Sequence, residues 1–331
     1  MSVVKNKVRV IYAGGTIGML LGEKGLEPSG NFASRLLPLL SEPWLAHLNC
    51  ELSFCELNPP LDSSAMNASH WFSLAAQILE EQSNYDAFIL LQGTDTLAWT
   101  AAALYCLLAN QLSKPLLLTA SQLPLGSPNS DALANIQFTL KQATQLKTGI
   151  FIAFNGQLLP PQATRKFHSE AFKAFSAVTL TNNSAKNFSS GFLTVKELRQ
   201  LATHFKPNLL RLPLIPSLND AWLSWQLEGL DGLILEGLGS GNAPPLPLTF
   251  QRLAELGQTK NLPVGLTSQC WQGGVNQNYA ASNALQQAGV VALGKMTPEY
   301  AEVRLVYLLA LQKLNKIALA DVFAYWLDPC F

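Results

Sequence analysis

The sequence predicts an α/β fold in which a larger N-terminal domain, built on a doubly wound and mostly parallel sheet, precedes a smaller C-terminal α/β domain. The first observation is that short β-rich runs alternate with amphipathic segments of helical length, as in βαβ units. The second is length, since 331 residues are more than one domain of ordinary size holds. The third is composition: 48% of the residues are hydrophobic and 13% are charged, so the chain can bury a large core.

Local patterns predict the elements of the N-terminal domain in order. A strand at residues 8–12 runs directly into two glycines, which end it. Asn67 is a good helix N-cap, and apolar residues recur at helical spacing over 71–79. The continuous apolar run 87–91 predicts a strand that is covered on both faces. The next elements alternate in type: a helix at 95–109, a strand at 115–119, a helix at 131–144 and a strand at 149–154.

The pattern of alternating strands and helices becomes weak over residues 172–204, where the chain is polar and rich in Asn and Ser. We therefore expect three parts: a larger N-terminal α/β domain at 1–190, a linker at 191–208 and a smaller C-terminal α/β domain at 209–331. In the last part, short strands are predicted at 210–215, 232–235 and 263–267. A long helix follows, with Thr297 as its cap and Pro298 at its first position.

Charge and cysteine usage exclude several classes of protein. Twenty-two basic residues balance twenty-two acidic ones without any block of like charge, so we expect no nucleic-acid partner. The longest nearly apolar stretch, 97–109, is shorter than the roughly 20 residues of a membrane span, and no signal peptide is visible. Five scattered cysteines without a CxxC pair fit reduced thiols in the cytoplasm. The low charge suggests a surface that is partly buried in an oligomer.

Small residues and hydroxyls follow three of the predicted strands, where parallel sheets collect ligands. The three turns are Ala13-Gly14-Gly15-Thr16-Ile17-Gly18, Gln92-Gly93-Thr94-Asp95-Thr96 and Thr119-Ala120-Ser121-Gln122. Hydroxyls that meet at one sheet edge favour nucleophilic chemistry over redox chemistry. The glycine spacing in the first turn is not GxGxxG, and the residues after Gly18 resemble a loop more than a dinucleotide-binding helix. We expect no nucleotide cofactor and no metal.

A hydroxyl becomes a useful nucleophile only when a base removes its proton. Thr94 stands beside the carboxylate of Asp95, and Lys166, in a loop after the strand at 149–154, is a candidate base. Taken one at a time, each residue favours a structural role. A turn threonine or Asp95 can cap the next helix, and a loop lysine is usually solvated.

Five motifs together resemble the bacterial L-asparaginases of the type I, cytoplasmic branch. They are AGGTIGM at 13–19, LDSSAM at 61–66, QGTDTLAWTA at 92–101, SQLPL at 121–125 and GSGNAP at 239–244. The resemblance covers nearly the whole chain, and the pair GGTI and GTDT is its most specific part. It implies hydrolysis of L-asparagine to L-aspartate and ammonia through an acyl-enzyme intermediate, with no cofactor.

The resemblance also implies roles for individual residues. Thr16 matches the nucleophile of the family, although Thr94 remains the rival. Thr94, Asp95 and Lys166 match a second catalytic set in which the lysine and the aspartate activate a hydroxyl. The stretch that holds the α-amino and α-carboxylate groups of the substrate is matched by Asp62, Ser63 and Ser64, with Asp95 also contacting the amino group.

Backbone donors and a neighbouring subunit complete the implied site. Gly93 and the Gly14-Gly15 turn offer N–H groups for the oxyanion of the tetrahedral intermediate. Asn242 matches a residue that reaches the site of a neighbouring subunit, which implies a homodimer or a homotetramer.

Two positions depart from the family pattern. Leu26 stands where the family usually has a loop tyrosine that assists the nucleophile. Tyr279 is the best candidate to replace that tyrosine, although a tyrosine in such a place more often belongs to the core. Glu236 stands where allosterically controlled type I enzymes can carry an arginine. Since a carboxylate repels the substrate's carboxylate, we expect no substrate allostery of that kind.

Two other functions remain open. A glutamine amidohydrolase related to the asparaginase-like subunit of archaeal glutamyl-tRNA amidotransferase has an additional N-terminal domain, whereas little chain precedes Gly14 here. A non-catalytic amino-acid-binding homologue is favoured by Leu26 alone. The presence of Thr16, Thr94, Asp95 and Lys166 favours the enzyme, because binding of an amino acid alone does not need all four.

Overall fold

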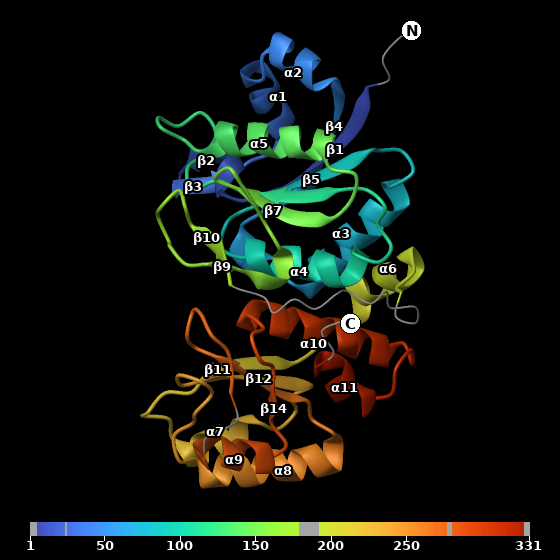
Figure 1. The fold of residues 1–331 in the computed structure, drawn as a ribbon. Helices are drawn as coiled ribbons and strands as arrows, with labels where there is room; N and C mark the ends of the chain where they lie inside the picture. The colour runs from blue at the N-terminus through green and yellow to red at the C-terminus, as the bar shows by residue number, and fades with distance from the viewer. Residues whose placement is uncertain (1–4, 24, 179–191, 277–279, 328–331) are drawn as a thin grey trace. The chain divides into compact units, whose positions relative to one another are not determined.

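The computed structural model describes residues 5–23, 25–178, 192–276 and 280–327. They form two compact units (Figure 1). The described residues up to Ala177 make the first unit together with Thr194–Thr203, and Leu193 and the residues from His204 onward belong to the second. The division at 1–190, 191–208 and 209–331 stays a prediction. One segment inside the predicted linker, Thr194–Thr203, packs with the first unit.

A mostly parallel sheet forms the centre of the first unit. Its strands, in spatial order, are β4 (Cys50–Leu61), β1 (Asn6–Gly14), β5 (Ala87–Leu91), β6 (Leu116–Thr119), β7 (Ile150–Phe154) and β8 (Gln157–Leu159). The first five are parallel, and β8 is antiparallel to β7. The chain passes from β1 out to β4 and then back to β5, so the order of the strands reverses between β1 and β5. Ligands bind at such a switch point in open α/β sheets.

Helices cover both faces of this sheet. On one face lie α3 (Ala68–Glu81) and α4 (Leu97–Leu108), and on the other lie α5 (Ala132–Gln145), α1 (Phe32–Leu36) and α2 (Glu42–Leu48) (Figure 1). All five residues of β5 are buried, which confirms the strand predicted from its apolar run. The side chain of Asn67 accepts a hydrogen bond from Ser69 N and caps α3 as predicted. The α6 helix (Val195–His204) joins this unit through an ion pair between Arg199 and Glu80.

Several helices and strands of the first unit were not predicted from the sequence. The long strand β4 contains two prolines, and α6 and β10 (Phe175–Ala177) fall in the stretch with weak signal. A short hairpin of β2 (Met19–Gly22) and β3 (Gly25–Pro28) follows the 3-10 turn η1 (Thr16–Gly18). The other small elements are η2 (Leu37–Leu39), η3 (Ser63–Ala65), η4 (Pro161–Ala163) and β9 (Thr164–Lys166), which pairs with β10. A hairpin after Gly18, in place of a helix, confirms that this segment is no dinucleotide-binding helix.

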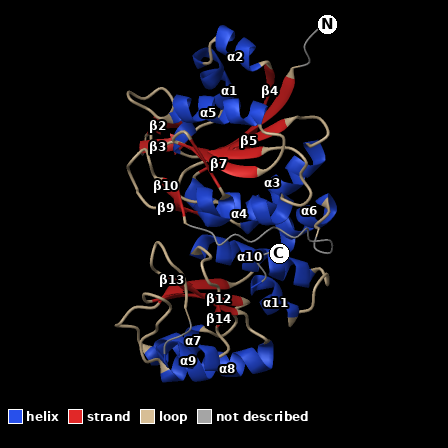
Figure 2. Cartoon of the chain, in the orientation of Figure 1, coloured by secondary structure: helices blue, strands red, loops and turns tan. Residues whose placement is uncertain are grey.

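The second unit contains a parallel sheet of β11 (Leu209–Pro213), β12 (Gly232–Gly237), β13 (Val264–Ser268) and β14 (Val291–Ala292). One face carries α7 (Asp220–Gln226), α8 (Pro247–Lys260) and α9 (Ala280–Gln287), and the other carries α10 (Pro298–Lys313) and α11 (Asp321–Leu327) (Figure 2). Thr297 accepts a hydrogen bond from Tyr300 N, so the predicted cap of α10 is confirmed. No helix within the described ranges is long and apolar enough to cross a membrane.

A largely buried charge network joins β11, β12 and α10. Arg211 Nε lies 2.7 Å from Glu236 Oε1, and its two terminal nitrogens lie 3.4 Å from Glu299 Oε1 and 3.8 Å from Glu302 Oε2. Glu236 and Glu299 are 7% and 5% exposed. One guanidinium therefore holds three carboxylates together in a place where water screens them poorly.

We expect Arg211→Met to lower the free energy of unfolding by about 3 kcal/mol, because removing one partner leaves buried carboxylates facing each other. Urea denaturation at neutral pH measures this change. Arg252→Met is the matched control, since Arg252 pairs with Glu228 and Glu255 on the surface. Its urea midpoint should match that of the parent protein. Equal midpoints for both variants would show that the network contributes nothing.

Candidate active site

Three turns of the first unit meet at the switch point between β1 and β5. Gly15 has φ 80°, and a Cβ there would overlap the backbone N of Gly93. A Cβ on Gly93 would in turn overlap the Ser63 hydroxyl. Gly15 N also donates to Leu61 O at 2.8 Å. The ends of β1, β4 and β5 are thus packed backbone against backbone, and the turns that carry Thr16, Ser63 and Thr94 lie together.

Lys166 connects Thr94 and Asp95. Its Nζ donates to Thr94 Oγ1 and to Asp95 Oδ1, both at 2.8 Å. The Thr94 residue is 5% exposed, while the side chains of Lys166 and Asp95 are 18% and 65% exposed. The hydroxyl is therefore shielded from water and lies within proton-transfer distance of an amine.

Two local expectations need correction here. Lys166 does not lie in a loop, because it is the last residue of β9 and pairs with Phe175 of β10. Asp95 is not the cap of the next helix, since α4 begins at Leu97 with Thr96 at the N-cap position. Lys166 can therefore contact Thr94, and Asp95 can contact Lys166.

Asp62, Ser63 and Ser64 form the neighbouring turn after β4. Asp62 Oδ1 accepts from Ser64 N and from Ser64 Oγ, both at 2.8 Å, which fixes an exposed carboxylate at the start of η3. Ser63 is 4% exposed, and its carbonyl accepts from Thr96 Oγ1 at 2.8 Å. This last bond ties the turn to the one that carries Thr94 and Asp95.

The first turn offers fewer backbone donors than the sequence suggested. Gly15 N–H is occupied by Leu61 O, so it is not available to an oxyanion. Thr16 itself lies half-buried at the start of η1. The N–H groups of the Gly14-Gly15 turn are therefore a weaker source of oxyanion stabilisation than the pattern of glycines predicted.

The remaining predicted residues lie elsewhere. Leu26 is in β3, opposite Leu21, and is 51% exposed, so no phenol is present at this place in the hairpin. Asn242 lies in the second unit, where Leu238 and Asn242 exchange backbone hydrogen bonds of 2.8 Å around a tight loop. Tyr279 lies outside the described residues.

Gln122 was marked by the sequence as part of a turn and of the SQLPL motif, without a role of its own. It follows β6 at the same sheet edge, and its Oε1 lies 3.5 Å from Thr94 Oγ1. The feature of the sequence that could have identified Gln122 is its position directly after a third predicted parallel strand. Within the described ranges, no group of three His, Cys, Asp or Glu side chains could hold a metal ion.

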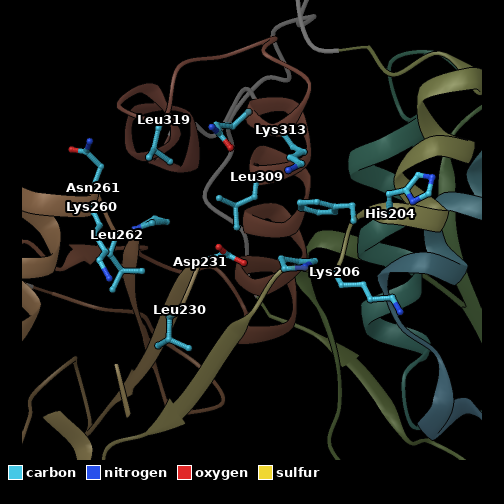
Figure 3. Close-up of a pocket in the computed structure, with 14 residues that line it drawn as sticks. His204, Lys206, Leu230, Asp231, Lys260, Asn261, Leu262, Leu309, Lys313 and Leu319 are labelled. Carbon is cyan, nitrogen blue, oxygen red and sulfur yellow. The ribbon is translucent and has the colours of Figure 1, made fainter. Parts of the chain in front are cut away.

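A surface hollow of about 420 Å³ lies in the second unit and is lined by other residues (Figure 3). Its lining includes Lys260 and Lys313, which stand in the last turns of α8 and α10, together with Lys206. Lysines in these positions balance the negative ends of helix dipoles. Lys260 is also paired with Glu228, so the cluster has a structural explanation.

Comparisons with known proteins show the family of this chain. Residues 7–191 match the family model "Asparaginase, N-terminal", and residues 210–323 match "Glutaminase/Asparaginase C-terminal domain". The chain is 33% identical to L-asparaginase 1 of Escherichia coli K12, over 92% of both chains. The crystal structure of L-asparaginase I from Vibrio cholerae superposes with a TM-score of 0.79 at 27% identity, covering 97% of each chain. The thermostable L-asparaginase from Thermococcus kodakarensis shares the fold, with a TM-score of 0.78 at 24% identity over 97% of this chain and 96% of that one. The chain therefore belongs to the asparaginase family.

Proposed function

We propose that this protein hydrolyses L-asparagine to L-aspartate and ammonia by a threonine nucleophile, through an acyl-enzyme intermediate. The observation that carries the proposal is the contact of Lys166 Nζ with both Thr94 Oγ1 and Asp95 Oδ1 at 2.8 Å. Amide hydrolysis needs a hydroxyl whose proton can leave and a group that receives it. The relatives named L-asparaginase support asparagine as the substrate.

The substrate is held by the turns after β4 and β5. Asp62 and Asp95 present carboxylates that attract its ammonium group. Ser63, Ser64 and the backbone around Gly93 supply donors for its α-carboxylate. The side-chain amide then lies over the meeting point of the turns, close to the two candidate threonines.

Thr16 Oγ1 attacks the amide carbon, its hydroxyl proton passes to the amide nitrogen, and the C–N bond breaks to release ammonia. Water then adds to the ester, which releases aspartate and returns the proton to Thr16 Oγ1. Thr94, Asp95 and Lys166 assist these proton transfers as one hydrogen-bonded set, in which Lys166 Nζ contacts both Thr94 Oγ1 and Asp95 Oδ1 and so activates the hydroxyl. Thr94 remains the alternative nucleophile, because it is the hydroxyl in direct contact with the amine.

We further propose a cytoplasmic homodimer or homotetramer in which Asn242 completes the site of a neighbouring subunit. The tight loop that holds Asn242 gives the residue a fixed position on the second unit. We also retain 1–190 and 209–331 as the limits of the two domains. The non-catalytic alternative, an amino-acid-binding protein, is favoured by the exposed Leu26 in the hairpin after Thr16.

The purified protein should release ammonia from L-asparagine, and Thr16→Ala and Thr94→Ala should each reduce the rate by at least about a hundredfold. A coupled assay for ammonia measures the rate, with L-glutamine as the second substrate. Thr144→Ala serves as the control for loss of a threonine hydroxyl, because the Thr144 hydroxyl bonds locally to Lys141 O within α5. If folded protein binds aspartate yet releases no ammonia from either amide, the binding alternative replaces the enzyme.

The rate should rise hyperbolically with asparagine concentration. Glu236 is a buried carboxylate that is paired with Arg211. It therefore cannot attract the carboxylate of a second substrate molecule as an arginine in its place would. Initial rates over a wide concentration range measure the curve. A strongly sigmoidal response would contradict this expectation.

Two inactive variants should complement each other if sites are shared between subunits. Coexpressed Asn242→Ala and Thr94→Ala chains form mixed dimers with one intact site, which should restore about a quarter of the wild-type activity. Ammonia release by the coexpressed pair, compared with each variant alone, measures this. Activity no higher than the sum of the separate variants would mean that Asn242 acts within its own chain or not at all.

A further inference from the structure

We propose that Gln122 is a positioning residue: its side-chain amide latches the loop between β9 and β10, so that Lys166 stays within reach of Thr94. This inference rests on the proposed function, since it assigns Gln122 a part in the same site. All the residues involved belong to the first unit.

The backbone of Gln122 is fixed by a carboxylate. Gln122 N donates to Asp131 Oδ1 and Oδ2, both at 3.0 Å, and Leu123 N donates to Asp131 Oδ1 at 3.1 Å. Asn135 Nδ2 then bridges Asp131 Oδ2 and Ala120 O, again at 3.0 Å each. The turn after β6 is therefore attached to the beginning of α5, and the side chain of Gln122 starts from a well-defined point.

The amide group of Gln122 spans the gap between this turn and the β9–β10 loop. Its Nε2 donates to Ser169 O at 3.1 Å and to Ala171 O at 3.0 Å. Because both N–H groups are used, the orientation of the amide is determined, and Oε1 faces Thr94 Oγ1 at 3.5 Å. One side chain thus touches both the loop that follows Lys166 and the hydroxyl that Lys166 contacts.

The loop needs such an attachment. Residues 167–170 are exposed, so apolar packing does little to hold them. Within the loop, His168 Nδ1 accepts from Glu170 N and Ala171 N, and Phe167 N donates to Ala174 O. These bonds shape the loop but do not tie it to the sheet edge. The two bonds from Gln122 supply that tie.

Proton transfer depends on a narrow range of distances. Lys166 Nζ lies 2.8 Å from Thr94 Oγ1, and Lys166 is the residue directly before the loop. A displacement of about 1 Å takes such a pair out of hydrogen-bond range and costs a large part of the rate. The latch therefore acts on kcat more than on substrate binding, which belongs to the turns that carry Asp62 and Ser63.

Two variants separate the latch from the acceptor that faces Thr94. Gln122→Met keeps the length of the side chain and removes its polar atoms. Gln122→Glu keeps an acceptor toward Thr94 but cannot donate to Ser169 O and Ala171 O at neutral pH. Gln145→Met, at an exposed glutamine at the end of α5, is the control for glutamine replacement.

We expect both Gln122 variants to lower kcat by about tenfold or more, with KM changed less than about twofold. Gln145→Met should match the parent protein. Hydrogen exchange of peptides that cover 167–174 should be faster in both Gln122 variants, while peptides from α3 and α4 exchange at the parent rate. Thermal denaturation checks that the variants remain folded.

Two results would overturn the latch directly: unchanged hydrogen exchange over 167–174, or a kcat within twofold of the parent in both variants. A Gln122→Glu variant with the kcat and exchange rates of the parent would also overturn it, because only the acceptor toward Thr94 would then matter. Faster exchange throughout the first unit would assign Gln122 a general structural role instead. If the parent protein hydrolyses no amide, the proposed function fails, and the exchange measurement alone still decides whether Gln122 holds the loop.

Discussion

The contact of Gly15 with Gly93 is the constraint on which the site depends. The first turn crosses the end of β5 so closely that neither glycine has room for a side chain. This approach is possible because β1 and β5 are adjacent, while the chain between them makes an excursion to β4 at the edge. Residues from three separate turns therefore reach one small region. Placing the same motifs on strands in sequential order would spread them along the sheet edge.

The ion pair of Lys166 and Asp95 contributes little to stability. Asp95 is 65% exposed, and water screens a pair with such a partner, so its net stabilisation is small. Thr94 is buried, however, and the amine that touches it is largely enclosed. The exposed Asp95 carboxylate can contact a charged ligand, while the Thr94 hydroxyl and the Lys166 amine are shielded from solvent. A surface salt bridge made only for stability would not require the buried threonine.

Sequence patterns predicted a strand that is buried along its whole length and helix caps that are formed by local hydrogen bonds. The strand Ala87–Leu91 is buried along its whole length, and Asn67 and Thr297 make the caps that their types favour. The strand β4 was missed because it lies at the edge of the sheet, half-exposed and with two prolines, and so lacks a continuous apolar signal.

Tertiary contacts decided the features of the site that the sequence did not show. Whether Gly15 N–H is available depends on Leu61, which is 46 positions further along the chain and reaches it only through strand pairing. Gln122 contacts Thr94 and the β9–β10 loop, and no local pattern reports either contact. The motifs placed the reacting groups near one another, and long-range packing determined their partners.

Leu26 places an alkyl side chain in the hairpin at the position where the family resemblance implies a tyrosine. A tyrosine does lie beneath the hairpin: Tyr12 stacks on Phe32 with ring centroids 4.5 Å apart, and a Cβ on Gly18 would overlap its hydroxyl. Burial raises the pKa of Tyr12 to about 12, against the lowering effect of nearby Arg35. A phenol with this pKa stays protonated at neutral pH and cannot accept a proton from a threonine. Tyr12 therefore supports the base of the hairpin, and the nitrogen in contact with the Thr94 hydroxyl is Lys166 Nζ, 2.8 Å away.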